Sequence, residues 1–189
     1  MKKILTASLL FVLITGAGCG GMRPTVFIHQ EYNFQFLERV AVVPFDNLSK
    51  DQGAGARATR VFIGQLLAAE AFDVVEPGEV AKALEKYSLV RTSELTTEQV
   101  IELGKQLKVQ GIFLGSVTEA DVIRSGGTTA NTVTIVARLV ETETGATIWS
   151  ATNTAGGRGF WSSLFGAGDK SQSEVMRDCI KTLLNTLVK

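Results

Sequence analysis

Side chains that could take part in catalysis are few in this sequence of 189 residues. His29 is the only histidine, and no cluster of metal ligands or nucleophiles surrounds it in the sequence. A catalytic triad or a metal site needs several such groups to converge in a fixed pocket. Glu141 and Glu143 lie near a predicted hairpin tip, which offers no pocket to shift the pKa of either carboxylate. We therefore expect both carboxylates to be solvated and the protein not to be an enzyme.

A glycine-rich segment imitates a dinucleotide-binding fingerprint. Residues 53–58 match the pattern Gly-x-Gly-x-x-Ala, and Glu76 follows about 20 residues later. In a true fingerprint the first glycine ends the strand, so that the amino terminus of the next helix meets the pyrophosphate. Here about seven residues separate Phe45, at the end of an apolar run, from Gly53. This spacing favours a loop that enters a helix, and we predict no cofactor.

Cys19 has the most distinctive setting of any residue. Residues 2–3 are lysines, residues 4–14 are mostly apolar, and the small residues 16–18 directly precede the cysteine. This order of charge, apolar stretch and small residues is typical of an export signal. About a dozen apolar residues are too few to cross a membrane as a helix, which takes roughly 20. We therefore expect residues 1–18 to be a signal peptide.

The same segment resembles the lipobox of bacterial lipoproteins, with Gly16 where that motif usually has leucine. The resemblance implies cleavage before Cys19, a diacylglycerol on its sulfur and a further acyl chain on the new amine. Two or more acyl chains hold a protein firmly at a membrane. Gly20, rather than aspartate, follows the cysteine. By resemblance to lipoproteins with enteric-type sorting, this favours the periplasmic face of the outer membrane.

Size and charge predict one folded domain behind this anchor. Loss of residues 1–18 leaves 17 basic and 19 acidic residues, a net charge of about −2. Nucleic acid is therefore not an expected partner, since phosphate neutralisation needs a basic face. We expect residues 19–36 to form a lipidated tether and lead-in. At roughly 3.3 Å per residue, about 20 residues would reach about 65 Å at most. Residues 37–189 remain for one domain with a real core.

The second cysteine, Cys179, lies next to apolar positions of a predicted helix. We expect a buried free thiol there, because unpaired cysteine behaves as a small apolar side chain. A thiol that bridges two chains is the alternative.

The hydrophobic patterns predict an α/β fold with a single mixed β-sheet in the order β-α-β-α-α-β-β-β-α and helices packed on it. The first half alternates strand and helix, and the second half is an antiparallel meander closed by a helix. Residues 125–131 are expected to form a short polar turn. The predicted strands cover residues 40–45, 72–76, 111–123, 132–141 and 147–151, and the predicted helices cover residues 57–71, 79–87, a segment capped by Ser93 or Thr96, and a last segment opened by Ser171 or Ser173.

Four segments, in this order, resemble the CsgG-like and LpoB-like family of bacterial lipoproteins and the amino-terminal domain of TolB. They are residues 40–48 (VAVVPFDNL), 72–76 (FDVVE), 103–117 (LGKQLKVQGIFLGSV) and 138–146 (RLVETETGA). The resemblance implies a TolB-like fold and a non-catalytic, lipid-anchored periplasmic module that binds an envelope protein. An oligomeric outer-membrane secretion component like CsgG is the alternative. The short turn argues against a pore, because each barrel-crossing strand needs roughly 9 to 11 residues.

The segment of residues 159–166 is the best candidate for partner binding. If exposed, its aromatic side chains would act as anchors, because such residues dominate binding energy. Alternatively, they fold beneath the last helix and complete the core. Phe34 and Phe36 raise a similar question, and there we expect core packing or strand addition. The predicted partner-binding residues are Phe160, Trp161, Leu164 and Phe165.

Overall fold

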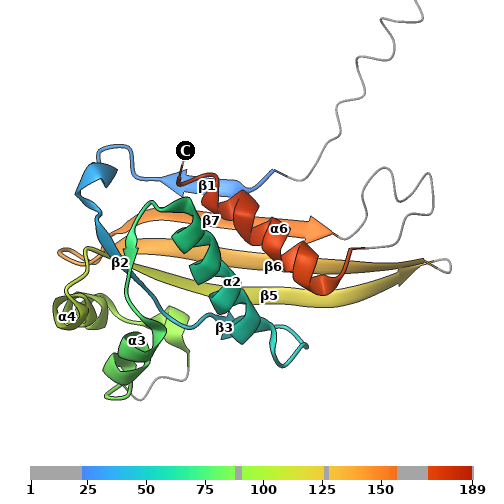
Figure 1. Ribbon diagram of the computed structural model, residues 1–189, viewed down its shortest axis with the longest axis horizontal. Coiled ribbons are helices and arrows are strands. Elements are labelled where there is room, and N and C mark those ends of the chain that lie inside the picture. Colours follow the sequence, from blue (N-terminus) through green and yellow to red (C-terminus); the bar gives the residue numbers. More distant parts are fainter. Residues whose placement is uncertain (1–22, 88–90, 126–127, 157–169, 189) are drawn as a thin grey trace, which may run out of the picture.

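The computed structural model describes residues 23–87, 91–125, 128–156 and 170–188. These residues form one mixed sheet of seven strands with four α-helices packed on it (Figure 1). The predicted α/β class and order of elements are confirmed, and two short strands, β1 and β3, are added. The elements are β1 (Thr25–Ile28), η1 (Phe34–Phe36), β2 (Arg39–Val42), β3 (Asp46–Asn47), α2 (Ala54–Ala69), β4 (Asp73–Val74), α3 (Pro77–Leu84), η2 (Thr92–Glu94), α4 (Thr97–Leu107), β5 (Gly111–Ser125), β6 (Thr128–Glu141), β7 (Thr147–Gly156) and α6 (Gln172–Leu184), where η marks a 3₁₀ turn.

The sheet has the strand order β1-β7-β6-β5-β2-β4, with β3 also paired to β5. Strands β2, β3 and β4 run parallel to their neighbours, whereas β5, β6, β7 and β1 form an antiparallel series. Pro44 separates β2 from β3 because proline cannot donate a ladder hydrogen bond. Beyond it, Asp46 and Asn47 resume pairing with β5, opposite Ser116 and Val117.

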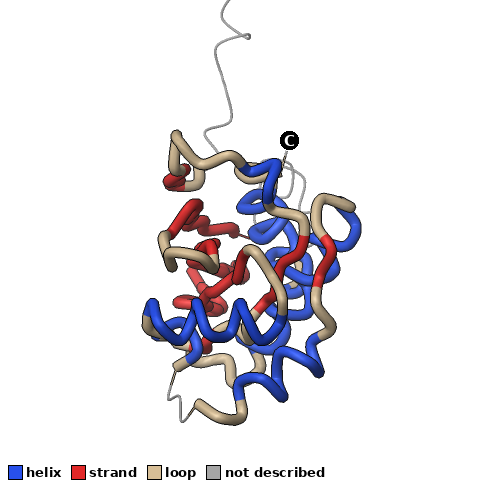
Figure 2. Tube along the Cα trace, turned by 90° about the vertical axis from the view of Figure 1, so that its left-hand side faces the viewer, coloured by secondary structure: helices blue, strands red, loops and turns tan. Residues whose placement is uncertain are grey.

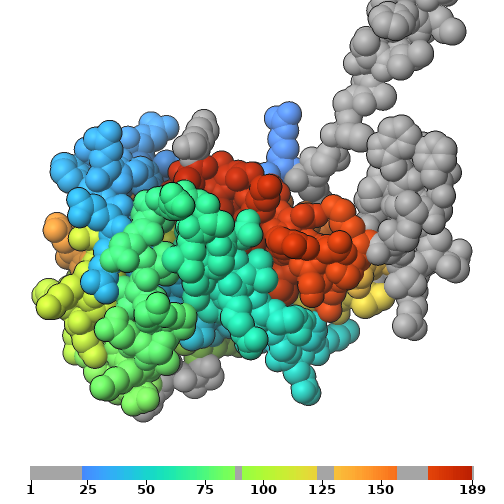
Figure 3. All heavy atoms as spheres, in the orientation of Figure 1, coloured from blue at the N-terminus to red at the C-terminus, as the bar shows by residue number. Residues whose placement is uncertain are grey.

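Helices α2 and α6 cover one face of the sheet, which we call the covered face. Both helices lie in front of the strands in Figure 1, and their side chains form a broad cover in Figure 3. Three fully buried aromatic side chains pack edge-on beneath them, with ring centroids of Phe62 and Phe113 5.1 Å apart and those of Phe113 and Trp149 6.2 Å apart. Alternate residues of β6, from Val133 to Leu139, supply the central strand of this core.

Helices α3 and α4 cover only part of the opposite face. They enclose a second, smaller core over β2 and β5 that contains Ala41, Ile112 and Leu114. Of the predicted cap residues, Thr96 begins α4 and Ser171 begins α6, each in a capping box. The Thr96 hydroxyl accepts from the Gln99 backbone N–H at 3.3 Å, and Ser171 and Glu174 form the equivalent pair at α6. Viewed along the strands in Figure 2, helices line one side of the sheet and the lower part of the other.

The β5–β6 hairpin is longer than predicted. Its two strands pair up to Ser125 and Thr128, so the expected polar turn over residues 125–131 is wrong. Residues 128–131 (TTAN) carry no apolar alternation, because the core beneath β6 begins only at Val133. These residues are a strand because they pair with β5, and hydrophobic periodicity along one segment does not indicate such pairing.

Strand β1 lies inside the segment that we expected to be a tether. It pairs with β7 in antiparallel register, with Thr25 opposite Thr152 and Ile28 opposite Trp149. The folded domain therefore begins before residue 37, and Thr25 lies only six positions after Cys19. Their maximum separation is about 22 Å, at up to 3.6 Å per residue, instead of about 65 Å.

The two lead-in phenylalanines have different environments. Phe34 packs against the core, in agreement with the prediction, whereas Phe36 is 73% exposed.

Candidate functional site

The half of the sheet that α3 and α4 leave uncovered is the candidate contact surface. Helix α6 packs along β6 and β7 from the covered side, and Figure 2 shows no helix on the upper part of the other side. The side chains there alternate with those of the core, as period-2 strands require. We call this surface the open face: Ser116 and Glu119 of β5, Thr134, Val136 and Arg138 of β6, and Ser150, Thr152 and Thr154 of β7.

Cross-strand pairing arranges these residues in rows. Thr152, Val136 and Ser116 lie opposite one another in one row, and Thr154 and Thr134 lie opposite one another in the next. The Thr134 hydroxyl lies 2.9 Å from the Thr154 hydroxyl and donates to a Glu119 carboxylate oxygen at 2.8 Å. The listed residues of the open face are mainly short and half-buried, and most of them are hydroxylated. Glu119 and Arg138 are charged, and the exposed Asp121 follows Glu119 on the same face of β5.

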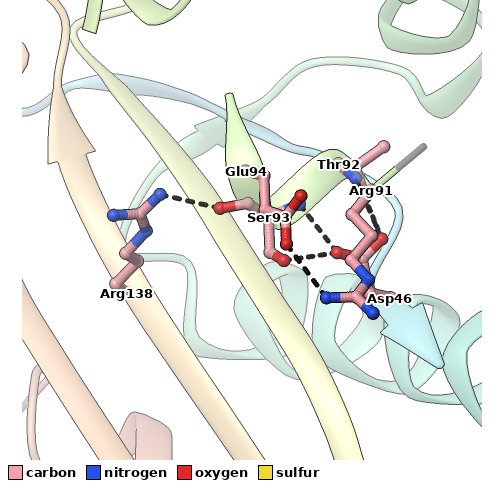
Figure 4. A network of polar contacts seen from close by, with 6 residues as sticks. All are labelled: Asp46, Arg91, Thr92, Ser93, Glu94 and Arg138. Atoms are coloured by element: carbon pink, nitrogen blue, oxygen red, sulfur yellow. Dashed lines mark hydrogen bonds and ion pairs between the residues drawn. The ribbon is translucent and has the colours of Figure 1, made fainter. Parts of the chain in front are cut away.

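A network of polar contacts borders the open face and fixes the η2 turn beside it (Figure 4). One Asp46 oxygen accepts from the backbone N–H and the hydroxyl of Thr92, at 2.9 and 2.8 Å. The other accepts from the Ser93 backbone N–H at 2.9 Å and from the Ser93 hydroxyl. Arg138 then donates to the Ser93 carbonyl oxygen at 2.8 Å. Asp46 therefore ties β3 to a turn that is 46 residues away in the sequence.

The charge state of Asp46 follows from these contacts. Partial burial opposes ionisation, but the hydrogen bonds from Ser93 and Thr92 together outweigh it and hold the pKa below its ordinary value. Hydrogen bonds to a carboxylate favour its charged form. Asp46 is an ionised structural acceptor, and among the described residues its carboxylate accepts from Thr92 and Ser93 of the η2 turn.

The fingerprint-like segment packs as a helix start. Gly53 precedes the first residue of α2, and a Cβ atom on Gly55 would lie 2.5 Å from the Phe45 carbonyl oxygen. Close approach of the helix to the chain after β2 thus explains the second glycine of the pattern. Asp51 and Arg57 form an ion pair across the same turn. This geometry agrees with the expected loop that enters a helix.

The prediction that Glu141 is solvated is wrong, whereas Glu143 is exposed as expected. The Glu141 side chain is only 7% exposed, and its oxygens accept from the backbone N–H groups of Glu143 and Thr144, at 2.9 and 2.7 Å. The tight turn after β6 leaves these N–H groups without backbone partners, and the carboxylate supplies the acceptors. The two glutamates therefore do not form an acid–base pair.

The two other side chains considered for chemistry, His29 and Cys179, do not form a reactive site among the described residues. His29 is exposed, and its backbone N–H extends the β1–β7 pairing to the Ile148 carbonyl oxygen. Cys179 is a buried free thiol, as predicted, and burial raises its pKa to about 11. Within the described ranges, no three His, Cys, Asp or Glu side chains come together as metal ligands.

The predicted lipidation and partner-binding sites lie outside the described residues. These are Cys19 on one side and Phe160, Trp161, Leu164 and Phe165 on the other. No helix in the described part of the chain combines the length and hydropathy needed to cross a bilayer.

Comparisons with known proteins support the fold. No family model matches the chain, and no curated protein matches its sequence. A solved PelC dodecamer from Paraburkholderia phytofirmans is similar over 88% of this chain and 98% of its own, with 19% identity and a TM-score of 0.58. The lipoprotein GNA1162 from Neisseria meningitidis is similar over 79% of this chain and 97% of its own, with 17% identity and a TM-score of 0.59. This α/β fold is therefore one that a bacterial lipoprotein also adopts.

Proposed function

We propose that this protein is a lipid-anchored, non-catalytic envelope module that binds another protein through the open face. The observation that carries the proposal is the composition of that face. Antiparallel sheets often turn one side to water, and such a side commonly carries long charged residues. Here, apart from Arg138, the side chains of β6 and β7 on this face are short hydroxyl and β-branched ones.

Such side chains suit a protein interface. Charged residues are depleted in the centre of interfaces, where their desolvation is costly. Thr134, Thr152 and Val136 are β-branched and already restricted at χ1, so they lose little rotamer entropy on binding. The sheet also holds them in fixed rows, and the Asp46 network fixes the border.

We propose a non-catalytic role because the carboxylates and the thiol described above already have structural partners or are buried. The Asp46 carboxylate accepts hydrogen bonds from the η2 turn, and the Glu141 carboxylate accepts them from the turn that follows it. The Cys179 thiol is buried. A catalytic acid, base or nucleophile must instead reach a substrate. The only attached groups that we propose are the acyl chains on Cys19, at the periplasmic face of the outer membrane.

A matched pair of variants tests this interface. We expect Thr152→Arg to reduce recovery of co-purifying envelope proteins by at least about tenfold, because even 1.4 kcal/mol weakens binding tenfold. Leu67→Arg, at a 54% exposed position of α2 over the covered face, should leave recovery unchanged. Thermal melting of both variants checks that each remains folded. Equal recovery from the two folded variants would exclude the open face as the interface.

A second candidate function is an oligomeric outer-membrane component, in which the partner is another copy of this chain. The crystallised dodecamers of PelC, which has the same fold, favour this candidate. Mass measurement of the detergent-solubilised protein distinguishes the two. A strict monomer contradicts the oligomeric component, whereas a ring that Thr152→Arg dissociates supports it.

We propose separately that the aromatic segment of residues 159–166 binds a partner protein. If Trp161 contacts the partner, Trp161→Ala abolishes recovery and leaves the melting temperature unchanged. If Trp161 belongs to the core, the same substitution lowers the melting temperature.

A further inference from the structure

Exposed large apolar side chains gather in one segment, directly after the predicted anchor. Val26, Phe27 and Ile28 of β1 are 38%, 50% and 43% exposed, and Phe36 follows at 73%. Elsewhere in the described residues, large apolar side chains of comparable exposure occur singly, at Leu48, Leu67 and Val122. Single exposed apolar residues are ordinary, whereas a contiguous group indicates a contact surface.

Strand β1 is an edge of the sheet. It pairs with β7 on one side, and no described strand pairs with it on the other. Because the His29 N–H bonds to Ile148, antiparallel alternation turns the backbone groups of Phe27 toward β7 and those of Val26 and Ile28 outward. The register places Val26 and Ile28 on the side of the covered face, opposite Ala151 and Trp149, and Phe27 on the side of the open face, opposite Ser150. The edge therefore has exposed apolar side chains on both sides of its outward peptide groups.

The length of chain between Cys19 and β1 limits what this edge can meet. Six positions span about 22 Å at most, so an acylated Cys19 would keep β1 within that distance of the lipid headgroups. The first acidic residue of the chain is Glu31, and Arg23 is the only formal charge between Cys19 and that residue. An anionic lipid surface would therefore not repel this segment.

We propose that the edge formed by β1 docks on the bilayer that holds the acyl chains, so that the β4 edge of the sheet points away from the membrane. This inference rests on the proposed lipid anchor. The outward peptide groups of Val26 and Ile28 limit the depth, because unpaired backbone groups do not enter the hydrocarbon region. Only the apolar side chains reach the boundary between headgroups and acyl chains, as in interfacial helices.

Site-specific fluorescence in vesicles tests the docking. Full-length, acylated Phe27→Cys and Leu48→Cys proteins are labelled with the dye NBD and reconstituted into phosphatidylethanolamine–phosphatidylglycerol vesicles. Leu48 is a matched control because it is 48% exposed and follows β3, which β7, β6 and β5 separate from β1. The native cysteines do not take the label, because Cys19 is acylated and Cys179 is buried.

Lipids brominated near the top of their acyl chains should quench the label at position 27 and leave the label at position 48 bright. Intact mass of the same samples reports acylation. An acylated protein with no quenching at position 27 contradicts docking but leaves the anchor intact. A blue-shifted but unquenched label at position 27 means that protein rather than lipid covers this position, and it also overturns the inference. A mass without acyl groups removes both the anchor and the docking.

Discussion

The two faces of the sheet differ in what their side chains can do. Ile135 and Val136 are neighbours on β6, yet Ile135 is fully buried beneath the helices of the covered face, whereas Val136 is half-buried between Thr152 and Ser116. The covered face holds the aromatic cluster of Phe62, Phe113 and Trp149. The open face holds short, mostly uncharged side chains in fixed rows. The same strands thus stabilise the fold on one side and offer a pre-ordered contact surface on the other.

Substitutions at these two neighbours should separate stability from binding. We expect Ile135→Ala to lower the free energy of unfolding by about 2–5 kcal/mol, because it leaves a cavity in a packed core. Val136→Ala should lower it by less than about 1 kcal/mol, as for most substitutions outside a core. Urea denaturation of the two variants measures the difference. Equal losses would mean that the open face is packed as tightly as the covered face.

Two glycines of α2, the helix that packs on the covered face, should respond to alanine substitution in opposite ways. We expect Gly55→Ala to cost about 1–3 kcal/mol, because the added carbon would overlap the Phe45 backbone and neither segment can move freely. Gly64 has no neighbour within 4 Å of the position of a Cβ atom. Gly64→Ala should stabilise the protein by about 0.5–1 kcal/mol, since alanine loses less backbone entropy in a helix. A stabilising Gly55→Ala would contradict the close contact between α2 and the chain after β2.

Asp46→Asn tests the network at the border of the open face. We expect a loss of about 1–2 kcal/mol near neutral pH, because the amide cannot replace both charged acceptor oxygens. The pKa of Asp46 is lowered by folding, so its contribution is complete above the unfolded pKa of about 3.9 and disappears as the pH falls through the folded pKa. The stability difference between wild type and variant should therefore narrow below about pH 4. A difference that stays constant down to pH 2 would show that the charge is not responsible.

Much of the fold could be predicted because it depends on local signals. The alternation of β6 identifies its buried face, and the residues of the capping boxes at Thr96 and Ser171 stand three apart in the sequence. Strands β1 and β3 could not be predicted in this way. They have four and two residues, which is too short for a period, and their pairing partners are far away in the chain.

The site was harder to predict than the fold. The open face exists because the core under α3 and α4 reaches β6 only at its end, at Val140, and helix placement cannot be read from residue alternation. The Asp46 network joins residues 46 positions apart, and no local pattern marks Ser93 as its donor. Glu141 was misjudged because a charged residue near a hairpin tip is usually solvated, whereas here the turn requires an acceptor.

Photo-crosslinking in intact cells tests the central claim most directly. A benzophenone amino acid replaces Thr152 on the open face or Leu67 on the outside of α2, in the full-length protein of the native host. We expect position 152 to capture one specific protein, either an envelope partner or a second copy of this chain, and position 67 to capture none. Capture from position 67 alone would contradict the account, because contact would then occur over the covered face.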